Sequence, residues 1–182
     1  MEVGVLGFIV AGLVVGFIVG MTGVGGGSLM TPILLWFGIN PATAVGTDLL
    51  YAAITKSGGI FVHQKNKNID WSITGWLTLG SVPAAALTLW LLSTLHTDTQ
   101  AMNAIIRQAL GFVLLLTALA ILFKQQLLAF AHKHAGDHYH LSGRSLNALT
   151  VVTGIMLGIM VTLTSIGAGA LGTVALFLLY PF

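Results

Sequence analysis

The fold is decided by one stretch, GLVVGFIVGMTGVGGGSLMTPILLW, which occupies residues 12–36. An apolar helix with a glycine every four residues runs into a cluster of glycines, and a shorter apolar run begins again at Ser28. In a lipid bilayer every main-chain N–H and C=O group needs an internal partner, so an unwound segment survives only when it is buried in protein or lines a polar cavity. Interrupted apolar segments of this kind indicate the binding sites of transporters. We therefore predict that the glycine cluster is the functional centre.

Composition places the chain among membrane proteins. Of its 182 residues, 56% are hydrophobic and only 7% are charged, whereas soluble domains carry about 25% charged residues. The formal net charge of +2 is too small to indicate binding to nucleic acid. Glu2 stands where a secretory signal peptide would have basic residues, so we expect the first helix to be retained. We predict a multi-pass protein of a bacterial inner membrane, surrounded by the lipid bilayer.

The apolar runs predict an all-α polytopic transmembrane bundle with glycine-broken helices. A helix needs about 20 apolar residues to span a bilayer, so the eleven residues of the second predicted helix suffice for about half of it. Asp70 is expected to cap a helix in which Pro83 introduces a kink. Basic residues gather around 65–67 and 124–144, which predicts that these loops are cytoplasmic. The predicted helices are 3–20, 28–38, 43–62, 71–95, 103–123 and one that begins at Ser145 or Asn147 and ends at Leu163.

An internal repeat is found at an offset of 142 residues, with nine identities over 23 positions and no gap. The glycine cluster and its flanking threonines fall in register, which favours an ancestral duplication over two unrelated packing helices. We predict a first repeat at 1–123, a polar His-rich cytoplasmic loop at 124–146 and the start of an incomplete second repeat at 147–182. The second copy ends early, so we expect about one third of a two-repeat transporter to be missing, and the repeats could be inverted or parallel. The identical pairs are Gly12/Gly154, Gly16/Gly158, Val19/Val161, Thr22/Thr164, Gly25/Gly167, Gly27/Gly169, Leu29/Leu171, Thr31/Thr173 and Leu34/Leu176.

Three segments carry a resemblance to a known family: residues 12–59 around GMTGVGGGSLMTP, GSVPAA at 80–85 and TSIGAGALGT at 164–173. They resemble the sulfite exporter TauE/SafE family, also called the four-toluene-sulfonate uptake permease family. The resemblance implies a membrane permease that moves sulfite, sulfonates, sulfoacetate or related anions and needs no cofactor. The chain departs from the family pattern by ending within the second repeat and by having Val174 where the first copy has Pro32.

The glycine clusters could bind an anion through the main chain. Unpaired N–H groups at the start of a helix, together with the positive end of its dipole, favour a negatively charged ligand. Serine and threonine hydroxyls could add donors, and alternating access would follow from rocking of one repeat against the other. Close helix packing is the competing interpretation of the glycines, and it is the one that we expect for Gly12, Gly16 and Gly20. The predicted substrate-binding residues are Thr22, Gly23, Gly25, Gly26, Gly27, Ser28, Thr31, Asp48, Lys56, Thr164, Ser165, Gly167 and Gly169.

Asp48 and Lys56 are the only charged residues between Val3 and Val62. A charge inside a membrane is costly, so each is a functional candidate. Lys56 could be a counter-charge for an anion, or it could extend along the helix to the nearby loop. Asp48 could carry a coupling proton, or it could cap a helix. Both interpretations of each residue stay open at this point.

Templates for enzymes do not fit. GVGGGS lacks the Lys-Ser/Thr of a P-loop, and neither GxSxG nor HExxH occurs, so we predict no catalytic residues. The histidines at 132–140 could bind zinc or nickel, but their spacing is irregular and the chain has no cysteine, so we predict a solvated loop and no metal site. The alternatives to a permease are a partner-dependent membrane subunit, in which the glycines serve packing, and a metal-sensing membrane protein. A homo-oligomer is compatible with each.

Overall fold

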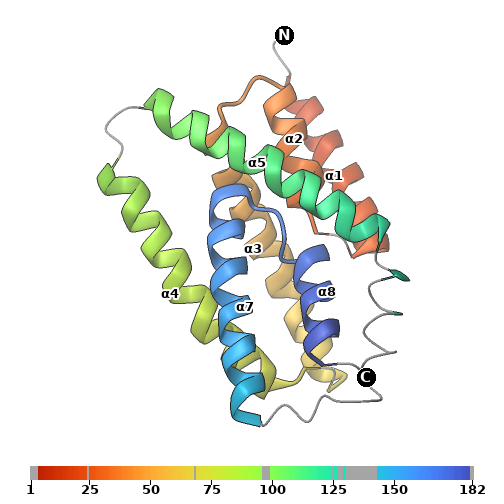
Figure 1. The fold of residues 1–182 in the computed structure, drawn as a ribbon. Coiled ribbons are helices and arrows are strands. Elements are labelled where there is room, and N and C mark those ends of the chain that lie inside the picture. Colours follow the sequence, from red (N-terminus) through yellow and green to blue (C-terminus); the bar gives the residue numbers. More distant parts are fainter. Residues whose placement is uncertain are drawn as a thin grey trace.

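The chain forms an all-helical bundle, seen in a computed structural model (Figure 1), and this confirms the predicted fold class. The structure describes residues 4–23, 25–67, 69–95, 99–123, 125–126, 129 and 143–180, and no strand occurs among them. Their helices are α1 (Val5–Thr22), α2 (Gly27–Trp36), α3 (Pro41–Lys65), α4 (Trp71–Leu95), α5 (Thr99–Leu122), α7 (Gly143–Thr164) and α8 (Ala170–Leu179).

Two helix starts follow directly from their capping residues. The Asn40 side chain accepts a hydrogen bond of 2.9 Å from the main-chain N–H of Thr43, and Pro41 occupies the first turn of α3, where its missing N–H costs nothing. Asp70 accepts two hydrogen bonds, of 2.9 and 3.1 Å, from N–H groups in the first turn of α4. The cap at Asp70 and the bounds of α4 are therefore as predicted.

Other helices extend beyond their predicted ends. α3 continues to Lys65, α5 begins at Thr99 and α7 begins at Gly143, whereas the predicted helices ended at 62, began at 103 and began at Ser145 or Asn147. The physical reason is that hydropathy marks where the apolar stretch begins, whereas the main-chain hydrogen bonds of a helix continue into polar residues. The predicted His-rich segment, including the histidines at 132–140, lies outside the described residues.

Four helices, α1, α4, α5 and α7, are long and apolar enough to cross a membrane. Much of their surface consists of large exposed apolar side chains, which suits contact with lipid. α3 covers the predicted span at 43–62, but it is not among the four, because polar and charged residues lower its hydropathy. The shorter helices α2 and α8 each have 10 residues. The chain is thus a multi-pass membrane protein.

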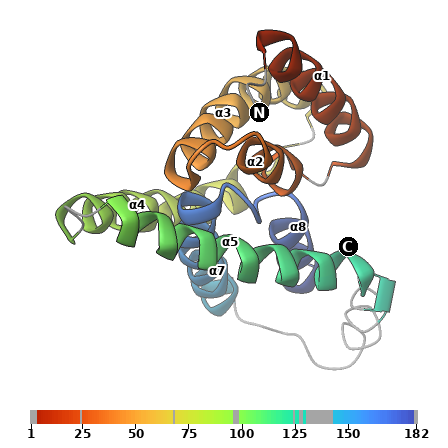
Figure 2. The same ribbon diagram turned by 90° about the horizontal axis from the view of Figure 1, so that it is seen from above.

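The helices form two groups when seen from above (Figure 2). α1, α2 and α3 lie together on one side, and α4, α5, α7 and α8 form the other group. The most extensive helix pair is α4 with α7. Three glycines make it possible: a methyl group added at Gly80 or Gly154 would overlap a main-chain oxygen of the other helix, and one added at Gly158 would lie 2.5 Å from such an oxygen. Small residues thus let two backbones approach directly.

The glycines of α1 differ from those of α7, although the two sets are paired in the proposed repeat. A methyl group added at Gly12 or Gly20 would meet nothing within 4 Å, and one added at Gly16 would lie 2.8 Å from the hydroxyl oxygen of Tyr51. The expectation of helix packing is therefore wrong for Gly12 and Gly20 in the described part of the chain. Glycines spaced four residues apart allow another helix to approach the backbone closely, but the spacing does not determine whether another helix lies there. The duplication itself stays an interpretation of the sequence.

We predict that Gly80→Ala destabilises the bundle by about 1–3 kcal/mol, because the added methyl group overlaps the backbone of α7. Gly75→Ala on the same helix is the matched control, since nothing lies within 4 Å of its added methyl group. Thermal unfolding in detergent measures the effect. Equal melting temperatures for Gly80→Ala and the wild type would contradict the close contact between α4 and α7.

Candidate functional site

The chain leaves the helical conformation at two places. After α1 the backbone has left-handed φ values at Gly23 (+67°) and Gly25 (+94°) before α2 begins. After α7 it has left-handed values at Ser165 (+59°) and Gly167 (+115°) before α8 begins. Glycine adopts this conformation without a steric penalty, whereas a non-glycine residue such as Ser165 rarely does. We call residues 23–27 and 165–169 the first and second break.

The two breaks touch each other through their main chains. A methyl group added at Gly27 would overlap the main-chain oxygen of Ser165, and one added at Gly25 would lie 3.5 Å from the main-chain nitrogen of Gly169. Any side chain at Gly27 would therefore push the segments apart. Glycine is needed at this position for close approach of two backbones.

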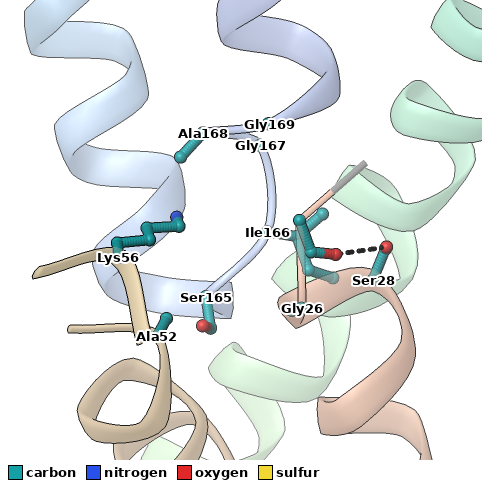
Figure 3. Close-up of a pocket in the computed structure, with 11 residues that line it drawn as sticks. Gly26, Ser28, Ala52, Lys56, Ser165, Ile166, Gly167, Ala168 and Gly169 are labelled. Atoms are coloured by element: carbon teal, nitrogen blue, oxygen red, sulfur yellow. Dashed lines mark hydrogen bonds between the residues drawn. The ribbon is translucent and has the colours of Figure 1, made fainter. Parts of the chain in front are cut away.

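A small hollow lies between the breaks, and Lys56 extends into it from α3 (Figure 3). Its volume of about 10 Å³ is close to the minimum that one water molecule requires. The hollow is polar because main-chain groups form much of its wall. The lining residues are Gly25, Gly26, Gly27, Ser28, Ala52, Lys56, Ser165, Ile166, Gly167, Ala168 and Gly169.

Main-chain N–H groups are available at the start of both short helices. Within the described residues, the N–H groups of Gly27 and Ser28 in α2 donate no hydrogen bond, nor do those of Ala170 and Leu171 in α8. The first N–H groups of any helix lack an intrahelical acceptor, and the helix dipole makes this end attractive to a negative charge. Lys56 adds a cationic side chain to the same hollow.

Most hydroxyl groups predicted to contact a ligand bond elsewhere in this conformation. The hydroxyl of Thr22 donates to Ile18, and that of Thr164 donates to Met160, each to a main-chain oxygen one turn earlier. Ser28 donates to the main-chain oxygen of Gly25 at 3.1 Å (Figure 3). These hydroxyls stabilise the ends of helices and the turn of the first break.

A buried carboxyl group lies directly behind the hollow. Asp48 is fully buried, and its Oδ2 accepts a hydrogen bond of 2.7 Å from the hydroxyl of Thr31. Methyl groups added at Gly26 and Gly27 would lie 3.5 Å from Oδ1 and 3.1 Å from Oδ2. One layer of glycine backbone therefore separates the carboxyl group from the hollow.

The structure divides the predicted site residues into three sets. Thr31, Asp48 and Thr164 are buried next to the hollow but do not line it, and Thr22 and Gly23 lie outside it. The prediction missed Ala52, which lies four residues from both Asp48 and Lys56 and so shares their helix face. It also missed Ile166 and Ala168, which stand between predicted residues. The lining residues that were predicted are Gly25, Gly26, Gly27, Ser28, Lys56, Ser165, Gly167 and Gly169.

The amino-acid sequence is similar to a protein family and to several known proteins. A family model described as sulfite exporter TauE/SafE matches residues 8–182. The probable membrane transporter protein YjnA of Bacillus subtilis (strain 168) is 40% identical over 173 residues, which cover 94% of this chain and 67% of the relative. The probable membrane transporter protein YunE of the same organism is 23% identical over 192 residues, or 96% and 67%.

A third relative matches only part of the chain. This probable membrane transporter protein of Methanocaldococcus jannaschii is 39% identical over 80 residues, which cover 41% of this chain and 29% of the relative. The chain spans about two thirds of the length of both Bacillus relatives. No solved structure gives a significant match.

We predict that Thr31→Val destabilises the protein by about 1–3 kcal/mol, because it removes the hydrogen-bond donor of a buried carboxyl group. Thr31→Ser keeps the hydroxyl and is the matched control. Thermal unfolding in detergent compares the two variants. If the valine variant unfolds at the same temperature as the serine variant, the hydrogen bond to Asp48 does not stabilise the fold.

Proposed function

Because this chain belongs to the sulfite exporter TauE/SafE family, a family of membrane transporters, we propose that it carries a small sulfur-containing oxyanion such as sulfite or a sulfonate. The anion binds between the two breaks. The observation that supports this most directly is the convergence of two helix N-termini and one lysine on a single hollow. Both Bacillus relatives are named probable membrane transporter proteins.

The chemistry of the hollow suits an oxyanion. Sulfite and sulfonate groups carry several acceptor oxygens on one sulfur, and free N–H groups from two directions can bond to different oxygens at once. The Lys56 ammonium group supplies the compensating positive charge. Charge-assisted hydrogen bonds of this kind are about twice as strong as neutral ones. Small residues on the wall leave the main chain accessible to the ligand.

Binding requires the two breaks to move apart. A hollow of about 10 Å³ accommodates little more than one water molecule, so the conformation described above is closed. The group formed by α1, α2 and α3 carries the first break, and the group that contains α7 and α8 carries the second. Rocking of one group against the other would open the site to either side of the membrane in turn, which is alternating access.

We expect Lys56→Ala to lower the flux of sulfite into liposomes by about tenfold or more, because a hydrogen bond to a charged group contributes about 1.5–3 kcal/mol. Flux is measured with purified protein reconstituted in vesicles at a fixed internal pH. Lys65→Ala is the control, since Lys65 lies at the end of the same helix and does not line the hollow.

Gly26→Leu should abolish flux, because Gly26 lines the hollow and the new side chain would meet Asp48 and Tyr51. Gly20→Leu should not, because a methyl group added at Gly20 meets nothing within 4 Å. Size-exclusion chromatography confirms that each variant is folded. Wild-type flux in both Lys56→Ala and Gly26→Leu would remove the site assignment. The glycines would then serve packing in a non-transporting membrane subunit.

A further inference from the structure

Two buried oxygen atoms next to the hollow have no hydrogen-bond partner. Within the described residues, neither Asp48 Oδ1 nor Ser165 Oγ makes a hydrogen bond. Asp48 and Ser165 have exposed fractions of 0% and 9%, so both are buried. Ser165 lies close to the Asp48 carboxyl group, but no hydrogen bond of normal geometry joins them. The acceptor Oδ1 of Asp48 and the hydroxyl group of Ser165 are thus both without a hydrogen-bond partner.

An ionised carboxylate at Asp48 would have too few hydrogen-bond donors. It can accept about four hydrogen bonds, yet Asp48 receives one, from Thr31. Burying a charge with so few partners costs several kcal/mol. The unpartnered pair does not select a charge state, because the Ser165 hydroxyl can donate to an ionised Oδ1 or accept from a protonated one. The charge state of Asp48 therefore depends on burial and on the charges placed near it.

Few charges act on this carboxyl group. The neighbouring helix α2 has no ionisable residue, α5 has Arg107 and α7 has Arg144, and α3 itself carries Lys56, which lines the hollow. Lys56 is eight residues from Asp48 on α3, about 12 Å along the helix axis. The ring of Tyr51, on the same helix, lies 3.8 Å from a methyl group added at Gly26 but does not line the hollow. Protonation of Asp48 is thus governed mainly by burial and by whatever charge enters the hollow.

We propose that Asp48 takes up a proton when an anion binds in the hollow, so that the protein moves the anion and a proton together. This inference rests on the proposed function. An anion between the breaks is separated from Asp48 by one layer of glycine backbone, and the repulsion between two negative charges favours the protonated acid. The proton comes from water on the side where the site is open, stays on the Asp48 carboxyl group while the anion is bound, and returns to water with the anion on the other side.

The coupling is reciprocal by thermodynamic necessity. If anion binding favours protonation, then protonation of Asp48 must favour anion binding to the same degree. The affinity for the anion should therefore fall as the pH rises through the range in which Asp48 loses its proton. With one linked proton, the fall amounts to at most about tenfold per pH unit.

The test uses methanesulfonate, which has no titratable group near neutral pH, and sulfite as a second probe. Isothermal titration calorimetry of the detergent-purified protein in two buffers of different ionisation enthalpy measures the number of protons bound per anion. We expect close to one proton for the wild type with methanesulfonate, and an affinity that decreases with rising pH by up to about tenfold per unit. The wild-type measurement needs no variant, so a failure of a variant to fold does not affect it.

Asp48→Asn removes the titratable group and retains a side chain that can accept from Thr31 and donate to Ser165. We expect its proton uptake to be lost and its affinity to vary less than about twofold over the same pH range. Asp70→Asn is the control, because Asp70 caps α4 outside the hollow and asparagine is an equally good cap.

The outcomes separate the two proposals. Anion binding by the wild type without proton uptake, or proton uptake that persists in Asp48→Asn, overturns the coupling but leaves the anion site in place. Absence of binding of both methanesulfonate and sulfite to the wild type overturns the proposed function, and the coupling with it. Proton uptake that is lost only in Asp48→Asn supports both.

Discussion

Main-chain N–H groups inside a membrane protein have no water to bond with, and this constraint organises the region around the two breaks. Both short helices begin within the bundle, and their first N–H groups find no protein acceptor among the described residues. Residues at the starts of both helices, Gly27 and Ser28 of α2 and Gly169 before α8, line one polar hollow between the breaks. The contact depends on glycine, because a methyl group at Gly27 would overlap the main chain of Ser165. A site of this kind consists largely of backbone and is therefore sensitive to very small side chains.

The two ionisable side chains near the hollow, Lys56 and Asp48, lie at different depths. Lys56 lies at the surface of the hollow, and Asp48 lies behind its glycine wall. The two are on one helix face, with Ala52 between them, so their separation is set by helix geometry. In the proposed function, a ligand in the hollow meets the positive charge directly and acts on the negative one through a single layer of backbone. The coupling that we propose therefore needs no direct contact between the anion and the buried acid.

The two segments that match in sequence have similar local courses and different surroundings. Each consists of a long helix, a break and a helix of 10 residues. α7 packs closely on α4 through Gly154 and Gly158, whereas Gly12 at the corresponding place in α1 has open space beside it. Similar amino-acid sequences thus form the same order of helix, break and helix. The neighbours of each helix are determined by the rest of the chain.

By itself the sequence determined the membrane class, the all-helical fold, the cap of α4 at Asp70 and the family, because apolar length, capping chemistry and characteristic motifs are local properties. It also identified eight of the residues that line the hollow, since an unwound glycine segment in a membrane protein must be buried in protein or line a cavity. Only the tertiary structure decided that the breaks touch, that Asp48 is buried behind Gly26 and Gly27, and that most of the predicted hydroxyl groups bond to the main chain. The contact between the breaks joins segments more than 130 residues apart in the sequence. A local pattern of residues carries no information about which distant backbone will fill the space beside a glycine.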